Sequence, residues 1–281
     1  MTDAKALVEF EERVLERKGS RLHALVGGPA GAPGLVLVHG LGGSRSNWAL
    51  LAPALARRRR VLVVDLPGHG RSEPLPAAPS LEPYAERVVA FAEQEGLVPA
   101  DYVGHSLGGL VSLRVALQRP ETVRRVVLAA GAGITSSTRY AERALAFLGW
   151  LQPGRRISPH WEAVARSAAL KRLVLGHWMT HSPEDLGREA VGALLRDVNL
   201  NTDTDGAWRA LTRDDPRTDL DRVAAPALVL WGAEDRQLPL ADAFDYARRL
   251  RAPVRVIPAC GHLLIVERPD ACLDAIAAFL G

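Results

Sequence analysis

One serine of this chain stands in a pattern that can make its hydroxyl group a nucleophile. Ser106 lies in the stretch YVGHSLGGLV, after a short apolar run and before a longer one. A Gly-x-Ser-x-Gly pattern between a strand and a helix is typical of a sharp, strained turn that lifts the serine clear of a sheet. Gly104 and Gly108 fit such a turn, because the chain must pass close by on either side of the serine. We favour this interpretation over a simple helix cap.

A serine hydroxyl is a weak nucleophile unless a base removes its proton and an acid orients that base. Both kinds of residue follow further along the chain. His262 comes after the run VRVI in VRVIPACGHLLIVERP, and Asp235 comes after the run LVLW in LVLWGAEDRQLP, with Glu234 as a neighbouring alternative acid. His262 is the last histidine of the sequence and the only one beyond Asp235, so the base has no substitute there.

These residues can meet only if the fold gathers them at one edge of a sheet. Strand-like runs alternate with helical segments, and most runs are short and wholly apolar, as in a parallel sheet covered on both faces. The predicted fold class is therefore α/β, with a mostly parallel central sheet and helices on both faces. Neighbouring parallel strands would bring Asp235 and His262 to the crevice that holds Ser106. The predicted strands are 22–26, 35–38, 61–65, 101–105, 125–130, 227–231 and 254–258, and the predicted helices are 46–57, 82–95, 107–118, 239–250 and 269–280.

The alternation stops between residues 135 and 215, a stretch that we call the insertion. It shows helical segments and no convincing strand, and Ser182 in SPEDL is expected to cap one of the helices. We predict a helical lid here, inserted in a core domain made of residues 1–134 and 216–281. Four of the six tryptophans lie in the insertion, and most are expected to pack it onto the core. They are Trp150, Trp161, Trp178 and Trp208.

Composition and charge limit the classes of function. The chain has 281 residues, 48% of them hydrophobic, which is enough for one large α/β domain with a substantial core. The formal net charge is +3, and 32 of the 35 basic residues are Arg. Because Arg is spread among many acids, we expect no nucleic-acid partner. The densest basic run, Arg57 to Arg60, is interpreted as a solvated helix end.

Neither the cysteines nor the N-terminal stretch suggests secretion, a membrane or a metal. Cys260 and Cys272 supply no disulfide framework and no metal cluster, and Cys260 is expected to be a small loop residue, not a rival nucleophile. The stretch MTDAKALVEFEERVLERKGS lacks the apolar core of a signal peptide, and no run approaches a membrane span. We expect a cytoplasmic protein without stable membrane insertion and without a metal, nucleotide or flavin cofactor. The sequence does not specify the oligomeric state.

Taken in order, these motifs resemble those of the α/β-hydrolase family, in its serine esterase and lipase branch. LVLVHGLGG resembles the oxyanion loop of that family, VVDLPGHGRS its Asp-x-Pro-Gly-His-Gly loop, and GHSLGG its nucleophile elbow. The resemblance covers nearly the whole chain. It implies the order Ser, Asp, His for a catalytic triad and favours Asp235 over Glu234.

The resemblance also implies a role for each residue. Ser106 would attack a substrate carbonyl, His262 would act as base and then as acid, and Asp235 would hold the imidazole. Backbone amides of Leu107 and Leu41 would form the oxyanion hole.

Several other residues of these motifs have expected roles in binding or in shaping the loops. Ser44 is either a further donor or a helix cap. The candidate substrate-binding residues are Gly40, Gly42 and Trp178. The histidines of the motifs, His39, His69 and His105, are expected to fix backbone turns.

A serine at the elbow disfavours the relatives that use an aspartate there. We therefore expect a carboxylesterase acting on small to medium-sized, mostly apolar esters. A carbon–carbon bond hydrolase of the meta-cleavage-product type is the main alternative, although a Pro and an Asn usual in those relatives are absent from GLGGS and from position 105. Lactonase, thioesterase and cofactor-free peroxidase activities stay open, and so does a ligand-sensing receptor of the same fold.

Overall fold

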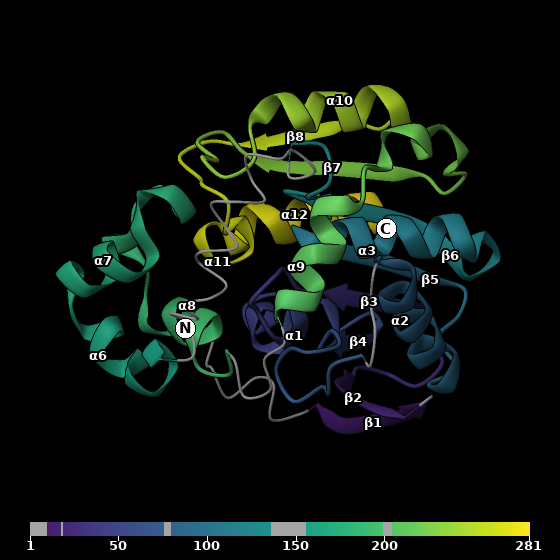
Figure 1. The fold of residues 1–281 in the computed structure, drawn as a ribbon, viewed down its shortest axis with the longest axis horizontal. Helices are drawn as coiled ribbons and strands as arrows, with labels where there is room; N and C mark the ends of the chain where they lie inside the picture. The colour runs from purple at the N-terminus through teal and green to yellow at the C-terminus, as the bar shows by residue number, and fades with distance from the viewer. Residues whose placement is uncertain (1–9, 18, 76–79, 136–155, 199–203) are drawn as a thin grey trace.

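The fold is built on one central sheet of eight strands, in the order β1-β2-β4-β3-β5-β6-β7-β8 (Figure 1). The computed structural model describes residues 10–17, 19–75, 80–135, 156–198 and 204–281. Strand β2 pairs antiparallel with β1 and β4, and all other neighbours pair parallel. The strands are β1 (Glu11–Arg17), β2 (Ser20–Gly27), β3 (Gly34–Val38), β4 (Arg60–Val64), β5 (Ala100–His105), β6 (Val123–Ala129), β7 (Ala227–Gly232) and β8 (Val254–Ile257).

All the strands expected from the sequence are present, and β1 is an additional one. Its sequence, EERVLER, is mostly charged, and only Leu15 is buried. Such a strand is stable at a sheet edge because one face and one side of its backbone are open to water. A charged strand of this kind cannot be recognised by searching the sequence for apolar runs. By contrast, β3, β5 and β7 are buried along their whole length, as expected for a sheet covered on both faces.

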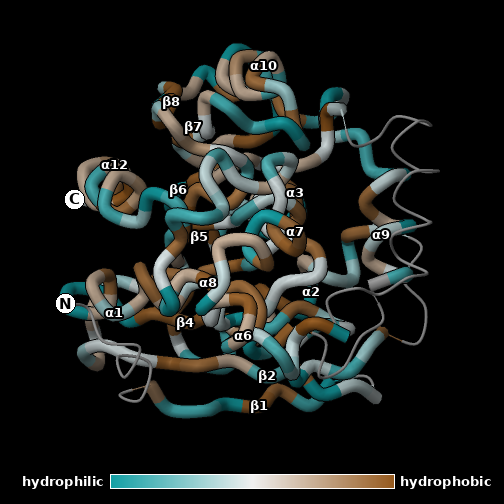
Figure 2. The backbone as a smooth tube through the Cα atoms, turned by 90° about the vertical axis from the view of Figure 1, so that its left-hand side faces the viewer, coloured by the Kyte–Doolittle hydropathy of each residue, from teal (hydrophilic) through white to brown (hydrophobic). Residues whose placement is uncertain are grey.

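Helices cover both faces of this sheet. Helices α1 and α12 contact each other, and so do α2 and α3; Figure 2 shows the two pairs on opposite sides of the strands. None of the described helices is long and apolar enough to cross a bilayer. Outside the insertion, the helices are α1 (Ala52–Leu55), α2 (Glu82–Gln94), α3 (Leu107–Gln118), α10 (Leu240–Leu250), α11 (Leu264–Glu267) and α12 (Pro269–Leu280).

The helix expected over 46–57 is wrong as a single element. A 3-10 turn, η2 (Arg45–Trp48), is followed separately by α1. Ser44 caps η2 by accepting from the Ser46 amide at 3.3 Å, which settles its role as a cap. Pro53 lies at the start of α1 and has no N–H to donate, so a helix cannot continue through it from the preceding turn.

The sequence suggested that the run Arg57 to Arg60 is a solvated helix end, and this is wrong for Arg59. Arg59 is 7% exposed and pairs with Asp101, which is itself fully buried at the start of β5. Its guanidinium also donates to the Gly281 carbonyl at 2.8 Å. This buried ion pair forms between residues far apart in the sequence, at the end of the sheet opposite Ser106.

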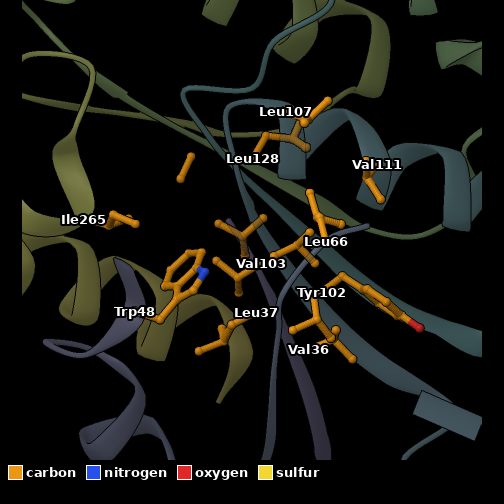
Figure 3. Close-up of a cluster of buried hydrophobic side chains, with 14 of the residues drawn as sticks. Val36, Leu37, Trp48, Leu66, Tyr102, Val103, Leu107, Val111, Leu128 and Ile265 are labelled. Carbon is orange, nitrogen blue, oxygen red and sulfur yellow. The ribbon is translucent and has the colours of Figure 1, made fainter. Parts of the chain in front are cut away.

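The apolar core runs from the sheet to the residues beside Ser106 and His262. Figure 3 shows Trp48 beside Leu37 and Val103 in this core. Leu107, directly after Ser106, is fully buried, and Ile265, three residues after His262, is 1% exposed. Close-packed protein interiors are hardly compressible, so the core holds the segments around Ser106 and His262 in place.

The described part of the insertion is helical and contains no strand. Figure 1 shows α6, α7 and α8 to one side of the sheet, and α8 contacts α11 and η2. Helix α7 is kinked at Gly176, where φ is 51°. The insertion helices are α6 (Trp161–Arg166), α7 (Ala168–Met179), α8 (Arg188–Leu195) and α9 (Thr204–Arg213).

The expected cap at Ser182 is wrong. The residues after it form only the three-residue 3-10 turn η5 (Pro183–Asp185), and the Ser182 side chain makes no capping hydrogen bond. Leu186 is extended, with φ −62° and ψ 124°, so the turn cannot grow into a helix before α8 begins.

The tryptophans of the insertion have three different environments. Trp208 is buried in the core, Trp161 packs against the guanidinium groups of Arg188 and Arg196, and Trp178 is 47% exposed. The fourth, Trp150, lies outside the described residues.

Candidate active site

Ser106 lies on the sharp turn between β5 and α3, with φ 51° and ψ −117°. A non-glycine residue in this region of backbone space costs about 1–3 kcal/mol and needs support from its surroundings. Here the Ser106 amide donates to the Ala129 carbonyl at 3.0 Å, and the Ser106 carbonyl accepts from the amides of Gly109 and Ala132, each at 3.0 Å. The strained turn is therefore held from both sides.

The glycines around Ser106 are required by close approach. A Cβ on Gly104 would lie 2.2 Å from the Gly108 carbonyl oxygen, and a Cβ on Gly108 would lie 2.2 Å from the Val38 carbonyl oxygen. Both distances are far shorter than any real contact, so neither position tolerates a side chain. The expectation that the chain passes close to both glycines is confirmed.

His262 and Asp235 complete a chain of hydrogen bonds that ends on the serine. His262 Nε2 lies 3.0 Å from Ser106 Oγ, and His262 Nδ1 lies 2.8 Å from Asp235 Oδ2. A carboxylate only accepts, so Nδ1 carries the proton and Nε2 is left to accept from the serine hydroxyl. The imidazole is 5% exposed and the Asp235 side chain 0%, which shields both hydrogen bonds from water.

The second oxygen of Asp235 is also bound. Asp235 Oδ1 accepts from the backbone amides of Gln237 and Leu238, each at 2.9 Å, so the carboxylate cannot rotate freely. The alternative acid, Glu234, points elsewhere and accepts from the Cys260 amide at 2.8 Å. The structure thus brings together Ser106, His262 and Asp235 and leaves Glu234 out.

Two neutral histidines hold the loops around the serine. Burial lowers the pKa of His105 to about 3, and its Nε2–H donates to the His262 carbonyl at 2.9 Å. Burial likewise lowers the pKa of His39 to about 4. Its Nε2 accepts from the Leu66 amide at 3.0 Å, so its Nδ1–H donates to the Gly40 carbonyl at 2.7 Å. Both histidines connect loops that are distant in sequence, as expected for residues that fix backbone turns.

The two predicted oxyanion donors belong to segments that adjoin Ser106. Leu107 is the first residue of α3, where backbone amides have no partner within the helix. Leu41 belongs to a turn closed by the Gly43 amide, which donates to the Gly40 carbonyl at 3.1 Å. A Cβ on Gly40 would lie 3.1 Å from Ser106 Cβ, so this turn lies directly beside the serine.

In the described part of the chain, two other residues predicted to bind substrate, Gly42 and Trp178, form no hydrogen bond with the Ser106 side chain. Gly42 has φ 70° and open space around its Cα, and Trp178 is partly exposed at the end of α7. The residue after Trp178, Met179, accepts through its carbonyl from the His262 amide at 2.9 Å. The end of α7 therefore contacts the backbone of the histidine loop.

The thiol of Cys260 is fully buried, and burial raises its pKa far above the ordinary value. It stays protonated at neutral pH and is a poor nucleophile.

Sequence reasoning missed the groups that hold the His262 loop. They are the Met179 carbonyl and the carboxylate of Glu267, which accepts from the Gly261 amide at 3.1 Å. Glu267 had one sequence signal, since it is a charged residue that ends the apolar run LLIV directly after His262. The Met179 carbonyl had none, because any residue supplies a carbonyl.

Comparison with known proteins agrees with this architecture. The family described as alpha/beta hydrolase fold matches residues 33–269. The acetyltransferase component of an acetoin cleaving system from Pseudomonas putida is 34% identical over 91% of this chain, which spans 65% of that protein's length. The mouse sn-1-specific diacylglycerol lipase ABHD11 is 28% identical, with 91% of this chain and 83% of the lipase covered. A solved structure of a hydrolase from Pseudomonas aeruginosa PA01 has 28% identity and a TM-score of 0.75, and covers 96% of this chain and 98% of that one.

The family match extends from the strand before the HGLGG turn to the start of the last helix, and so includes the strands that carry Ser106, Asp235 and His262. The chain belongs to the alpha/beta hydrolase fold family.

Proposed function

We propose that this protein is a serine hydrolase that cleaves carboxylic esters through an acyl-enzyme intermediate. The observation that carries the proposal is the unbroken hydrogen-bond chain from Asp235 through His262 to Ser106, with the serine held in a strained turn. The relative described as a lipase supports the ester class.

In the acylation step, Ser106 Oγ attacks the ester carbonyl carbon while His262 Nε2 takes the hydroxyl proton. The imidazole becomes positive, and Asp235 stabilises that charge across the 2.8 Å hydrogen bond. The carbonyl oxygen becomes an oxyanion facing the amides of Leu107 and Leu41, each worth about 3–4 kcal/mol of transition-state stabilisation. When the tetrahedral intermediate collapses, the C–O bond breaks and His262 gives its proton to the leaving alcohol.

Deacylation repeats these steps with water. His262 Nε2 removes a proton from water, and the hydroxide attacks the acyl carbon of the Ser106 ester. Collapse of the second intermediate returns the proton to Ser106 Oγ and releases the carboxylic acid. The site is then in its starting state.

Within this proposal, the insertion, residues 135–215, is the lid, and residues 1–134 and 216–281 form the core domain. This assignment is supported by contacts of the insertion with the His262 loop and with the segment that follows the oxyanion loop. The end of α7 binds the His262 backbone, and on the side of the oxyanion loop Asn47 Nδ2 donates to the Ala193 carbonyl of α8 at 2.8 Å. Side chains of the insertion would then select the substrate, which we expect to be small to medium-sized and mostly apolar.

The test is hydrolysis of a series of p-nitrophenyl esters of increasing acyl length by the wild type, Ser106→Ala and Ser112→Ala. Ser112 is the matched control, because its hydroxyl is buried in α3, the helix that begins directly after Ser106, and donates to the Gly108 carbonyl at 2.7 Å. We expect turnover by the wild type and by Ser112→Ala, and loss of at least about 10³-fold in Ser106→Ala. Full activity in folded Ser106→Ala, or no turnover of any ester, contradicts the proposal.

Other substrates in the same assay separate the alternatives. A dienol ketone that reacts with a much larger kcat/KM than every ester would assign carbon–carbon cleavage to the triad. A lactone or thioester that dominates the series would assign those bonds instead. Saturable binding of a small molecule without turnover would indicate a receptor.

A further inference from the structure

His262 is held through its backbone as well as its side chain. Its amide and that of Leu263 donate to the Met179 carbonyl at 2.9 and 3.2 Å, and its carbonyl accepts from His105. Met179 is the last residue of α7, so two of these three backbone hydrogen bonds come from the insertion. The position of the imidazole over Ser106 therefore depends on how the insertion sits against the loop of residues 261–263, the histidine loop.

One buried carboxylate joins the same two segments. Glu267 is 8% exposed, and its Oε2 accepts from the His181 amide at 2.7 Å and from the Gly261 amide at 3.1 Å. Its Oε1 accepts from the Gly261 amide as well, at 3.2 Å. Gly261 directly precedes His262, and His181 lies two residues after Met179. The carboxylate thus connects the insertion, the histidine loop and helix α11, to which Glu267 itself belongs.

The partners of this carboxylate indicate a geometric role. Among the described residues, no Lys or Arg forms an ion pair with Glu267, so its buried charge is compensated mainly by backbone amides, with a further contribution from the positive charge of the adjacent Arg268. Burial raises the pKa of Glu267, whereas the amides of His181 and Gly261 lower it. Burying a charge lowers the stability of the folded protein, and a neutral side chain could fill this space at a smaller cost in stability. The buried carboxylate therefore indicates that the amides of His181 and Gly261 need a common acceptor.

We propose that Glu267 is a positioning residue for His262. It holds the histidine loop against the insertion, and so keeps Nε2 within hydrogen-bond distance of Ser106. This inference rests on the proposed function for its effect on rate. Because a displacement of about 1 Å costs on the order of 10²-fold in rate, the support need only move slightly to matter.

The test compares Glu267→Ala, Glu267→Gln and Asp101→Asn with the wild type. Asp101 is the matched control, since it is also a buried carboxylate, but it pairs with arginines, Arg59 first and then Arg124 and Arg125 at 3.4 and 3.9 Å. It lies at the far end of β5 from Ser106. For Glu267→Ala we expect kcat to fall about 100-fold while KM changes less than about threefold. Glu267→Gln keeps one oxygen for the two amides at Oε2, and kcat should fall by less than about tenfold. Asp101→Asn should lower the unfolding temperature and leave kcat per folded molecule unchanged.

Two readouts separate positioning from simple loss of stability. Rates are measured well below each unfolding temperature, and the downfield proton signal of His262 Nδ1–H, bonded to Asp235, is followed by NMR. The proposal expects this signal to shift or broaden in Glu267→Ala, partly recover in Glu267→Gln and persist in Asp101→Asn. If kcat and the signal are unchanged in Glu267→Ala, or if Asp101→Asn lowers kcat equally, the proposal is overturned.

Two further outcomes, an unfolded Glu267→Ala variant and a wild type without esterase activity, are decided by other measurements. Should Glu267→Ala not fold, Glu267→Gln decides: wild-type kcat together with a wild-type signal overturns the proposal. Should the wild type hydrolyse no ester, the proposed function fails, while the His262 signal in the Glu267 variants still tests whether this carboxylate positions the imidazole.

Discussion

A methyl group at Gly261 would act directly on the contact between the histidine loop and the insertion. A Cβ there would lie 2.9 Å from the His181 nitrogen and 2.9 Å from the Thr180 carbonyl carbon and Cα, all backbone atoms. Rotation of a side chain cannot relieve these contacts. The φ angle of Gly261 is outside the left-handed region, so alanine fits its backbone conformation, and the only conflict is steric.

The size of the effect follows from these distances. Ordinary contact with a Cβ begins at 3.4 Å, so the loop and the insertion must separate by about 0.5 Å. This separation stretches the 2.9 Å bond between the His262 amide and the Met179 carbonyl and shifts the imidazole. If 1 Å costs about 10²-fold, half that shift costs about tenfold in kcat. Overpacking should also lower the free energy of unfolding by about 1 kcal/mol.

The assay measures ester hydrolysis and urea unfolding of Gly261→Ala beside Gly187→Ala. Gly187 lies in the same insertion, at the N-terminus of α8, and a Cβ there would meet no atom within 4 Å. We expect no change in kcat for Gly187→Ala and about a tenfold decrease for Gly261→Ala. Wild-type kcat in Gly261→Ala, or equal losses in both variants, would refute the claim that this contact positions His262.

Three further predictions concern the triad and the neutral histidines. Asp235→Asn should lower kcat by about 10⁴-fold, because an amide can hold the imidazole in the wrong tautomer; a folded variant that loses less than tenfold would contradict the proposed role of the acid. His105 and His39 have pKa values of about 3 and about 4 in the folded protein, below the usual 6.5, so the stability that they contribute is complete above pH 6.5 and is lost as the pH falls. Urea unfolding should give a free energy of unfolding that is lower at pH 5 than at pH 7 by about 2 kcal/mol for each histidine. In His105→Gln, this difference between the two pH values should be smaller by about 2 kcal/mol. Ser106→Gly should be about 1 kcal/mol more stable than Ser106→Ala, since glycine relieves the strain at φ 51°; equal unfolding free energies would count against a strained turn.

Local patterns were sufficient for strands β2 to β8 and for the candidate residues that follow three of them, but not for the charged edge strand β1. The apolar runs that became β3, β5 and β7 are buried from end to end, and a pattern of this kind can be recognised without knowing the neighbours. The motif around Ser106 can also be recognised locally, because Gly104 is required by its close approach to Gly108 four residues on. The contact that requires Gly108 is with Val38 of the neighbouring strand β3. The local pattern alone left Glu234 and Asp235 as alternative acids, and the family resemblance favoured Asp235. In the folded loop, Asp235 is the acid that binds His262, whereas Glu234 binds the Cys260 amide.

The sequence by itself therefore determined the α/β architecture and the candidate nucleophile, acid and base. Periodicity, glycine spacing and strand ends are properties of short segments, so they can be recognised in the sequence alone. Only the tertiary structure decided that Arg59 is buried against Asp101 and that Glu267 binds both Gly261 and His181, the latter 86 residues before Glu267 in the sequence. A buried charge is stable only with the partners that the complete fold brings to it, and no local pattern encodes partners so far apart.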